Sequence, residues 1–243
     1  MRTTRSAQYL PHPLVLVFVF FLALLVVAMV LTLLIPETNP RTPGHRVDWT
    51  PRVGVPRTAR GVYVRSVLVV VPTFTLLGLF SSLTPRFIHD SLHIDNLAIA
   101  GAATFVLFVV GTVAQLIFRG RESRTLVLVG LPLLAASLGL VLSGLLATNL
   151  LAFSLGTITG GVGAGMAFMG GLAQLVDAVP HETHARSVAA YFIAAQSGLA
   201  IPVLTIGVLA PIITLQTATV IVVAGVVALA AVAFSANLRA PQR

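Results

Sequence analysis

The chain has 243 residues, of which 57% are hydrophobic and only 9% are charged. Soluble domains carry about 25% charged residues, so this composition excludes an ordinary soluble fold, whose surface needs more polar groups. The basic side chains are 15 arginines with no lysine, and seven acids leave a net charge of +8. The absence of cysteine excludes disulfides and thiolate chemistry, and the absence of lysine excludes a retinal Schiff base.

The first apolar run, residues 14–35, holds 22 uncharged residues. A helix of that length extends about 33 Å, which is enough to cross the hydrocarbon core of a bilayer. The run is longer than the roughly 7–15 apolar residues of a secretory signal, and no small-residue cleavage site follows it. The sequence therefore predicts a retained transmembrane helix that ends at Pro36.

Two longer regions, 125–176 and 187–238, each hold 52 residues without a charge. A single helix of that length would extend about 78 Å, so each region must fold back once. The turns are expected at Thr148-Asn149 and Ala210-Pro211, since a residue before proline avoids the helical conformation. Continuous apolar runs favour helices over barrel strands. We therefore predict an all-α membrane protein with seven spans, at about 14–35, 66–87, 97–118, 125–147, 150–176, 187–209 and 212–236.

The arginines predict the orientation. Twelve of the 15 lie in the loops 36–65, 119–124 and 177–186 or in the tail after 236. Because basic loops stay in the cytoplasm, the N-terminus is expected outside and the C-terminus inside. The segment 41–65 is then a basic inner loop that could also attract anionic lipid headgroups. Since its arginines alternate along the sequence with apolar spans, we expect no nucleic-acid partner.

Several stretches are similar to parts of one transporter family. "AQYLPHPLVLVFVFFLAL" looks like the start of a sixth helix, and "IPETNPRTP" like its exit into a central loop. "RGRESRT" is similar to the basic turn between an eighth and a ninth helix. The run from "LGTITGGVGAG" to "LTIGVLA" looks like helices ten and eleven. In this order, the sequence resembles helix six, the central loop and the C-terminal half of a bacterial major facilitator superfamily carrier.

The resemblance implies a domain plan and a function. Residues 1–35 would hold helix six with a short outer N-terminus, 36–65 the cytoplasmic central loop, 66–236 the C-terminal six-helix bundle, and 237–243 a cytoplasmic tail. The implied activity is transport of a small molecule across the plasma membrane, of the efflux kind, without a cofactor. Five helices of the family pattern have no counterpart here, so a missing N-terminal half is an expected partner. The alternative is a non-transporting remnant or a partner subunit.

Side chains on the spans could line the path of the substrate. No acid or arginine lies in a helix core, so a carboxylate that couples transport to a proton is not expected in this chain. Uncharged polar groups at these positions either line the path or form hydrogen bonds between helices. The candidates for the path, with apolar wall residues, are Phe74, Thr75, Gly78, Ser82, Phe108, Gln115, Tyr191, Gln196 and Ser197.

Small residues predict close helix packing and a bend. Gly156/Gly160 and Gly161/Gly165 are small-xxx-small pairs, which let helices approach closely. Gly198, Pro202 and Gly207 predict either a bending site or a static kink.

No metal site and no enzymatic activity are expected. His89 and His93 are four residues apart but fall in an expected outer loop without a clear third ligand. "HETH" at 181–184 is interpreted as a solvated helix cap. An intramembrane enzyme would need a Ser/His or paired-Asp set at depth, and none is present.

Overall fold

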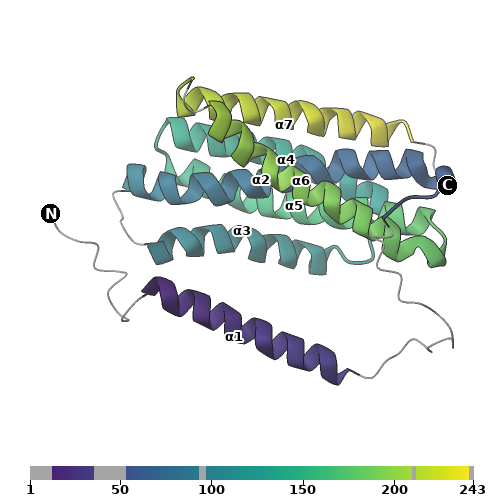
Figure 1. Cartoon of the computed structure of the whole chain (residues 1–243). Helices are drawn as coiled ribbons and strands as arrows, with labels where there is room; N and C mark the ends of the chain where they lie inside the picture. The colour runs from purple at the N-terminus through teal and green to yellow at the C-terminus, as the bar shows by residue number, and fades with distance from the viewer. Residues whose placement is uncertain (1–12, 36–52, 93–96, 210–211, 241–243) are drawn as a thin grey trace. The chain divides into compact units, whose positions relative to one another are not determined.

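The structure is a computed structural model that describes residues 13–35, 53–92, 97–209 and 212–240 (Figure 1). Within these ranges the chain forms seven α-helices and no β-strand. It divides into two units, Met1–Pro51 with Asp95–Ala98, and Arg52–Ile94 with Ile99–Arg243. Helix α1 belongs to the first unit, and helices α2 and α4 to α7, with α3 from Ile99 onward, form the second.

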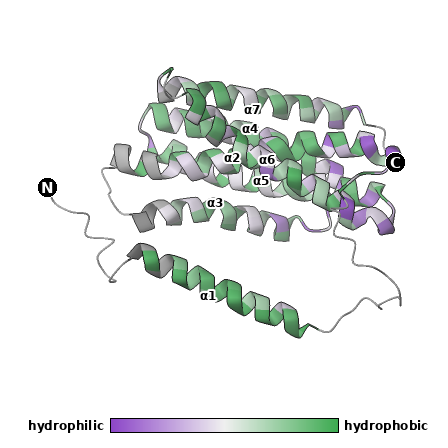
Figure 2. Cartoon of the chain, in the orientation of Figure 1, coloured by the Kyte–Doolittle hydropathy of each residue, from purple (hydrophilic) through white to green (hydrophobic). Residues whose placement is uncertain are grey.

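Helix α1 covers Pro13–Leu34, 22 residues. It holds no charged side chain, and Figure 2 shows most of it in the hydrophobic colour. A helix that is apolar on every side has no face suited to water, so it fits a lipid environment. This confirms the predicted helix at 14–35.

The remaining helices follow the predicted spans closely. Charge-free runs of this length form helices in lipid because every backbone donor and acceptor is then paired within the segment. The bounds are α2 Arg60–Leu92, α3 Leu97–Ile117, α4 Ser123–Leu146, α5 Leu150–Ala178, α6 His184–Leu209 and α7 Leu215–Leu238.

Helix α2 is longer than the sequence predicts. It begins six residues before position 66 and continues to Leu92, so 33 residues make a helix of about 50 Å. The prediction ended the span near Arg86 because it treated the charge as a boundary. An arginine near a helix end can extend its charged group to the bilayer surface while its backbone stays helical. His89 therefore lies on α2 and not in an outer loop, whereas His93 lies outside the described residues.

In the second unit, α4 and α5 lie side by side, and α2 packs against α4, α5, α6 and α7 (Figure 1). Glycine makes the closest of these contacts possible. A Cβ atom built on Gly163 of α5 would lie 2.6 Å from the backbone nitrogen of Leu134 on α4. Any side chain at residue 163 would therefore push the two helices apart.

The turn between α4 and α5 lies where the sequence predicts it. Thr148 has a positive φ of 49°, which reverses the chain. The side chain of Asn149 then accepts a hydrogen bond of 3.1 Å from the backbone N–H of Ala152, which caps α5. The second predicted turn, Ala210-Pro211, lies outside the described residues, between the end of α6 and the start of α7.

Candidate substrate pathway

Four aromatic rings meet where α2, α5 and α6 approach one another. The ring of Phe168 lies 5.7 Å from that of Phe74, 5.9 Å from that of Tyr191 and 6.0 Å from that of Phe192. These separations and the tilted ring planes are typical of favourable aromatic pairs. We call these four residues the aromatic cluster.

The members of the aromatic cluster differ in exposure. Tyr191 is fully buried, and its hydroxyl donates a 3.1 Å hydrogen bond to the backbone oxygen of Phe168. Phe192 is 42% exposed. Of the two candidates from the sequence, Phe74 is half-buried and Tyr191 is part of the core. Phe168, at the centre of the cluster, was missed because it lies within a glycine-rich run that we interpreted only as a packing motif.

Thr75 connects α2 to α6. Its hydroxyl lies 2.8 Å from the oxygen of Val71 in its own helix and 2.9 Å from the oxygen of Gly198 in α6. In a regular helix, the oxygen of residue 198 would accept from the N–H of residue 202. Residue 202 is proline, which has no N–H. Thr75 therefore supplies the hydrogen bond that Pro202 cannot.

Glycines bring α2 and α6 together at the same point. A Cβ atom on Gly78 would lie 2.8 Å from the oxygen of Leu199 and 3.0 Å from Cγ of Pro202. A Cβ atom on Gly198 would lie 2.6 Å from the oxygen of Val71. Gly78, which the sequence suggests for the path, is therefore buried against a backbone.

The other candidate glycines differ from one another. Built Cβ atoms on Gly156 and Gly160 would meet α4 within about 3 Å, at Val141 and Ser137. Those on Gly161 and Gly165 would meet α3, at Leu107 and Gly111. The pair Gly156/Gly160 thus faces α4, and the pair Gly161/Gly165 faces α3. Gly207 has open space around it.

Exposed polar groups on α2 and α6 offer a different kind of surface. Gln196 and Ser197 are exposed on α6, and the Ser197 hydroxyl donates to the oxygen of Ile193 at 2.9 Å. Ser82 is exposed on α2 and donates to the oxygens of Gly78 and Leu79, at 3.1 and 3.0 Å. Only Gln196 of these keeps its polar group free of a described hydrogen bond.

On α3, Phe108 is 46% exposed and Gln115 is half-buried. Thr112, one turn beyond Phe108, is exposed and donates to the Phe108 oxygen at 2.9 Å. Like α6, α3 thus presents aromatic and uncharged polar groups outward.

Charged residues of the described helices lie near the helix ends. On the described helices, every arginine and acid lies within two turns of a terminus, the deepest being Arg65 and Arg86. Figure 2 shows hydrophilic residues gathered at the end of the second unit where α7 terminates. Among the described residues, no three His, Asp or Glu side chains form a group that could hold a metal ion. The middle of the unit can therefore recognise ligands through apolar contacts, hydroxyls and amides.

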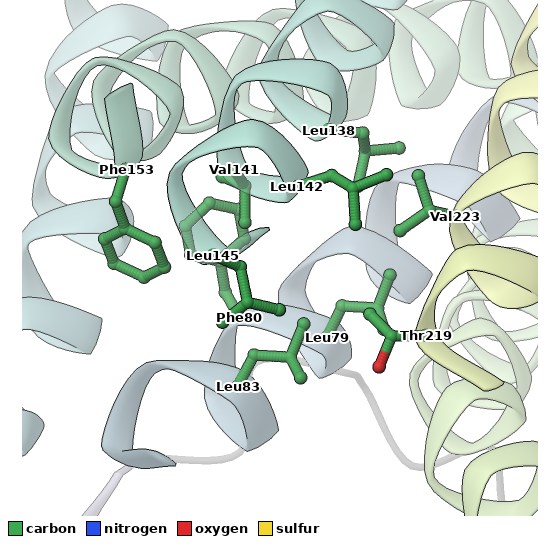
Figure 3. Close-up of a pocket in the computed structure, with 10 residues that line it drawn as sticks. All are labelled: Leu79, Phe80, Leu83, Leu138, Val141, Leu142, Leu145, Phe153, Thr219 and Val223. Atoms are coloured by element: carbon green, nitrogen blue, oxygen red, sulfur yellow. The ribbon is translucent and has the colours of Figure 1, made fainter. Parts of the chain in front are cut away.

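An apolar cavity between α2, α4, α5 and α7 is too small for a substrate. Ten side chains around Phe80 and Phe153 line it (Figure 3), and its volume is about 10 Å³. A cavity needs roughly 10–15 Å³ and polar partners to hold even one water molecule. The hydroxyl of Thr219 is the one polar group in its lining, so this cavity is a packing gap.

These features define a multi-pass helical membrane protein. Five of the helices are long and apolar enough to cross a bilayer on the described residues alone, and α1 and α3 hold shorter apolar segments. The Major Facilitator Superfamily profile matches residues 11–203, which is most of the chain. The chain therefore belongs to the major facilitator superfamily, whose members carry solutes across membranes. No protein with a curated description matches the sequence.

Proposed function

We propose that the chain exports an uncharged, partly apolar small molecule from the cell along the exposed faces of α3 and of α6. The observation that carries this proposal is the combination of Phe192 and Gln196 on α6. An aromatic ring and an amide with no described partner lie four residues apart, so they share a helix face. Lipid acyl chains cannot form a hydrogen bond with the free amide of Gln196, whereas a substrate with a carbonyl or hydroxyl group can.

The absence of charge in the middle of the described helices supports an uncharged substrate. A charged solute near the bilayer midplane needs a counter-charge, and the described part of the second unit offers none at that depth. If a proton drives the transport, its carboxylate belongs to other helices. A second six-helix bundle, packed against the exposed faces of α3 and of α6, would complete the path. The family places substrates between two such bundles.

We also propose the plasma membrane as the location, with the ends of α3, α5 and α7 at the cytoplasm. The distribution of arginines supports this orientation. Arginines lie in the loops 119–124 and 177–186, next to these helix ends, and basic loops stay in the cytoplasm.

Cysteine labelling tests the path, because the natural chain has no cysteine. We expect Gln196→Cys and Thr112→Cys to react with a water-soluble methanethiosulfonate in membranes. Val220→Cys, on the exposed side of α7, is the lipid-facing control and should not react. Nile red, an uncharged lipophilic dye, should slow the labelling of Gln196→Cys, whereas citrate should not. Labelling of Val220→Cys as fast as that of Gln196→Cys would refute the path.

Deletion of the gene in the source cells tests the direction. Export predicts that the deleted cells accumulate more Nile red, and that the wild-type gene restores the low level. A gene with Gln196→Leu should restore less, because leucine removes the amide without shortening the side chain greatly. Equal accumulation with and without the gene would refute export of this class of molecule.

A further inference from the structure

A large open cavity lies at one end of the second unit, away from the aromatic cluster. Its volume is about 700 Å³, which is within the usual range for ligand sites. The first turns of α2 and α4 and the last turns of α5 and α7 form its walls.

One set of groups in the cavity is positive. Arg65 of α2 and Arg124 of α4 both line it, and the Nε atom of each is buried without a hydrogen-bond partner. Arg124 donates one hydrogen bond, 2.8 Å long, to the oxygen of Leu238. No hydrogen bond or ion pair joins the Arg65 guanidinium to another described residue. The start of α4 adds unpaired backbone N–H groups, and the starts of α2 and α4 both add positive dipole ends.

A second set of groups is negative. Glu122 and Asp177 also line the cavity, and both side chains are exposed. Glu122 accepts a 3.1 Å hydrogen bond from the Thr125 hydroxyl, and neither carboxylate forms an ion pair within the described part of the chain. The last turns of α5 and α7 contribute their negative dipole ends, and at the end of α7 the Leu238 oxygen already accepts from Arg124.

The cavity therefore holds two cationic and two anionic side chains that do not neutralise one another directly. A simple anion would meet two carboxylates there, and a simple cation would meet two guanidinium groups. A ligand with both charges, separated by a short linker, would match both sets. Arginine binds phosphate oxygens in a fork, and a primary ammonium donates three hydrogen bonds to carboxylates.

We propose that this cavity binds an aminoethyl-phosphate group, supplied by the headgroup of a zwitterionic phospholipid. The phosphate contacts Arg65 and Arg124, and the ammonium contacts Glu122 and Asp177. The cavity lies at the ends of membrane-spanning helices, which is the depth at which lipid headgroups lie. This inference does not depend on what the protein transports.

Native mass spectrometry of the full chain in detergent tests the proposal. Phosphatidylethanolamine, phosphatidylcholine and phosphatidylglycerol are added at equal concentrations. We expect phosphatidylethanolamine to be retained about tenfold better than the other two, because choline has no N–H donor and glycerol carries no positive charge. Soluble glycerophosphoethanolamine distinguishes the source of the ligand. Displacement of the lipid means that the free group suffices, and no displacement means that the acyl chains are required.

Paired variants give the sharpest outcome. Arg65→Gln with Arg124→Gln should lower retention of phosphatidylethanolamine about tenfold. Glu122→Gln with Asp177→Asn should reverse the preference toward phosphatidylglycerol, a gain that a misfolded protein would not show. Arg119→Gln with Arg121→Gln removes two exposed arginines from the neighbouring turn, outside the cavity, and should change nothing. Equal retention of the three lipids, or an equal effect of the two arginine pairs, would overturn the proposal.

Discussion

The hydrogen bond from Thr75 to Gly198 makes a quantitative prediction about the packing of α2 on α6. Valine at position 75 keeps the branched shape and removes the hydroxyl. The oxygen of Val71 loses little, because it also accepts the helical N–H of residue 75. The buried oxygen of Gly198 loses its partner, since Pro202 has no N–H to offer.

An unsatisfied buried oxygen costs about 1–3 kcal/mol in soluble proteins, whereas hydrogen bonds between membrane helices average about 0.6 and reach about 1.7 kcal/mol. We therefore expect Thr75→Val to lower the free energy of unfolding by about 1–1.5 kcal/mol. SDS titration of the protein in mixed micelles, followed by circular dichroism, measures this difference.

The second half of the experiment uses Pro202→Ala as the background. Alanine restores an N–H that can bond to the oxygen of Gly198, so Thr75→Val should cost about 1 kcal/mol less there. The double-mutant cycle removes the separate effect of Pro202→Ala on packing against Gly78. An equal effect of Thr75→Val in both backgrounds would show that the hydroxyl does not serve this oxygen.

Three further predictions concern single positions. Asn149→Ala removes the cap of α5 and should lower stability by about 1 kcal/mol in the same titration, whereas Asn149→Asp should be nearly neutral. Gly163→Ala should lower the melting temperature of the detergent-purified protein, because the added carbon meets the α4 backbone, while Gly139→Ala, which has open space, should not. Thr148→Cys should react with impermeant maleimide on intact cells and Glu182→Cys only after permeabilisation; labelling of both on intact cells would contradict the orientation.

The helices could be predicted because hydrophobic run length is a physical requirement of the bilayer. A helix such as α4 needs an uncharged run that is long enough to cross the hydrocarbon core. This run can be recognised in the sequence of the helix itself. The error in α2 shows the limit of the method. Hydropathy marks where lipid ends, and a helix that is stabilised by its own hydrogen bonds can continue past that point, as α2 does to Leu92.

The contacts within the candidate pathway could not be predicted in the same way. Thr75 was selected as a polar residue on a helix face, but its partner is a backbone oxygen 123 residues away, which depends on how α2 and α6 cross. The cavity beside Arg65 combines four helix ends that are distant in sequence. From the sequence, Arg65 falls in the loop 36–65, and Glu122 and Arg124 fall in a basic turn; the charge balance across the cavity is a property of the tertiary fold.

Among the described residues, both hydrogen bonds that join α2 to α6 reach residues that precede Pro202. The Tyr63 hydroxyl donates to the oxygen of Ala190 at 3.2 Å, and the Thr75 hydroxyl donates to that of Gly198. Beyond Pro202, Gly207 has no neighbour within 4 Å of a built Cβ atom, and Leu204 and Val208 are 66% and 68% exposed. A bend at Pro202 would therefore move the end of α6 without breaking either hydrogen bond to α2. The helix that carries Gln196 thus combines a first part that is hydrogen-bonded to α2 with an end where Ile206 packs against the core and Leu204 and Val208 are exposed.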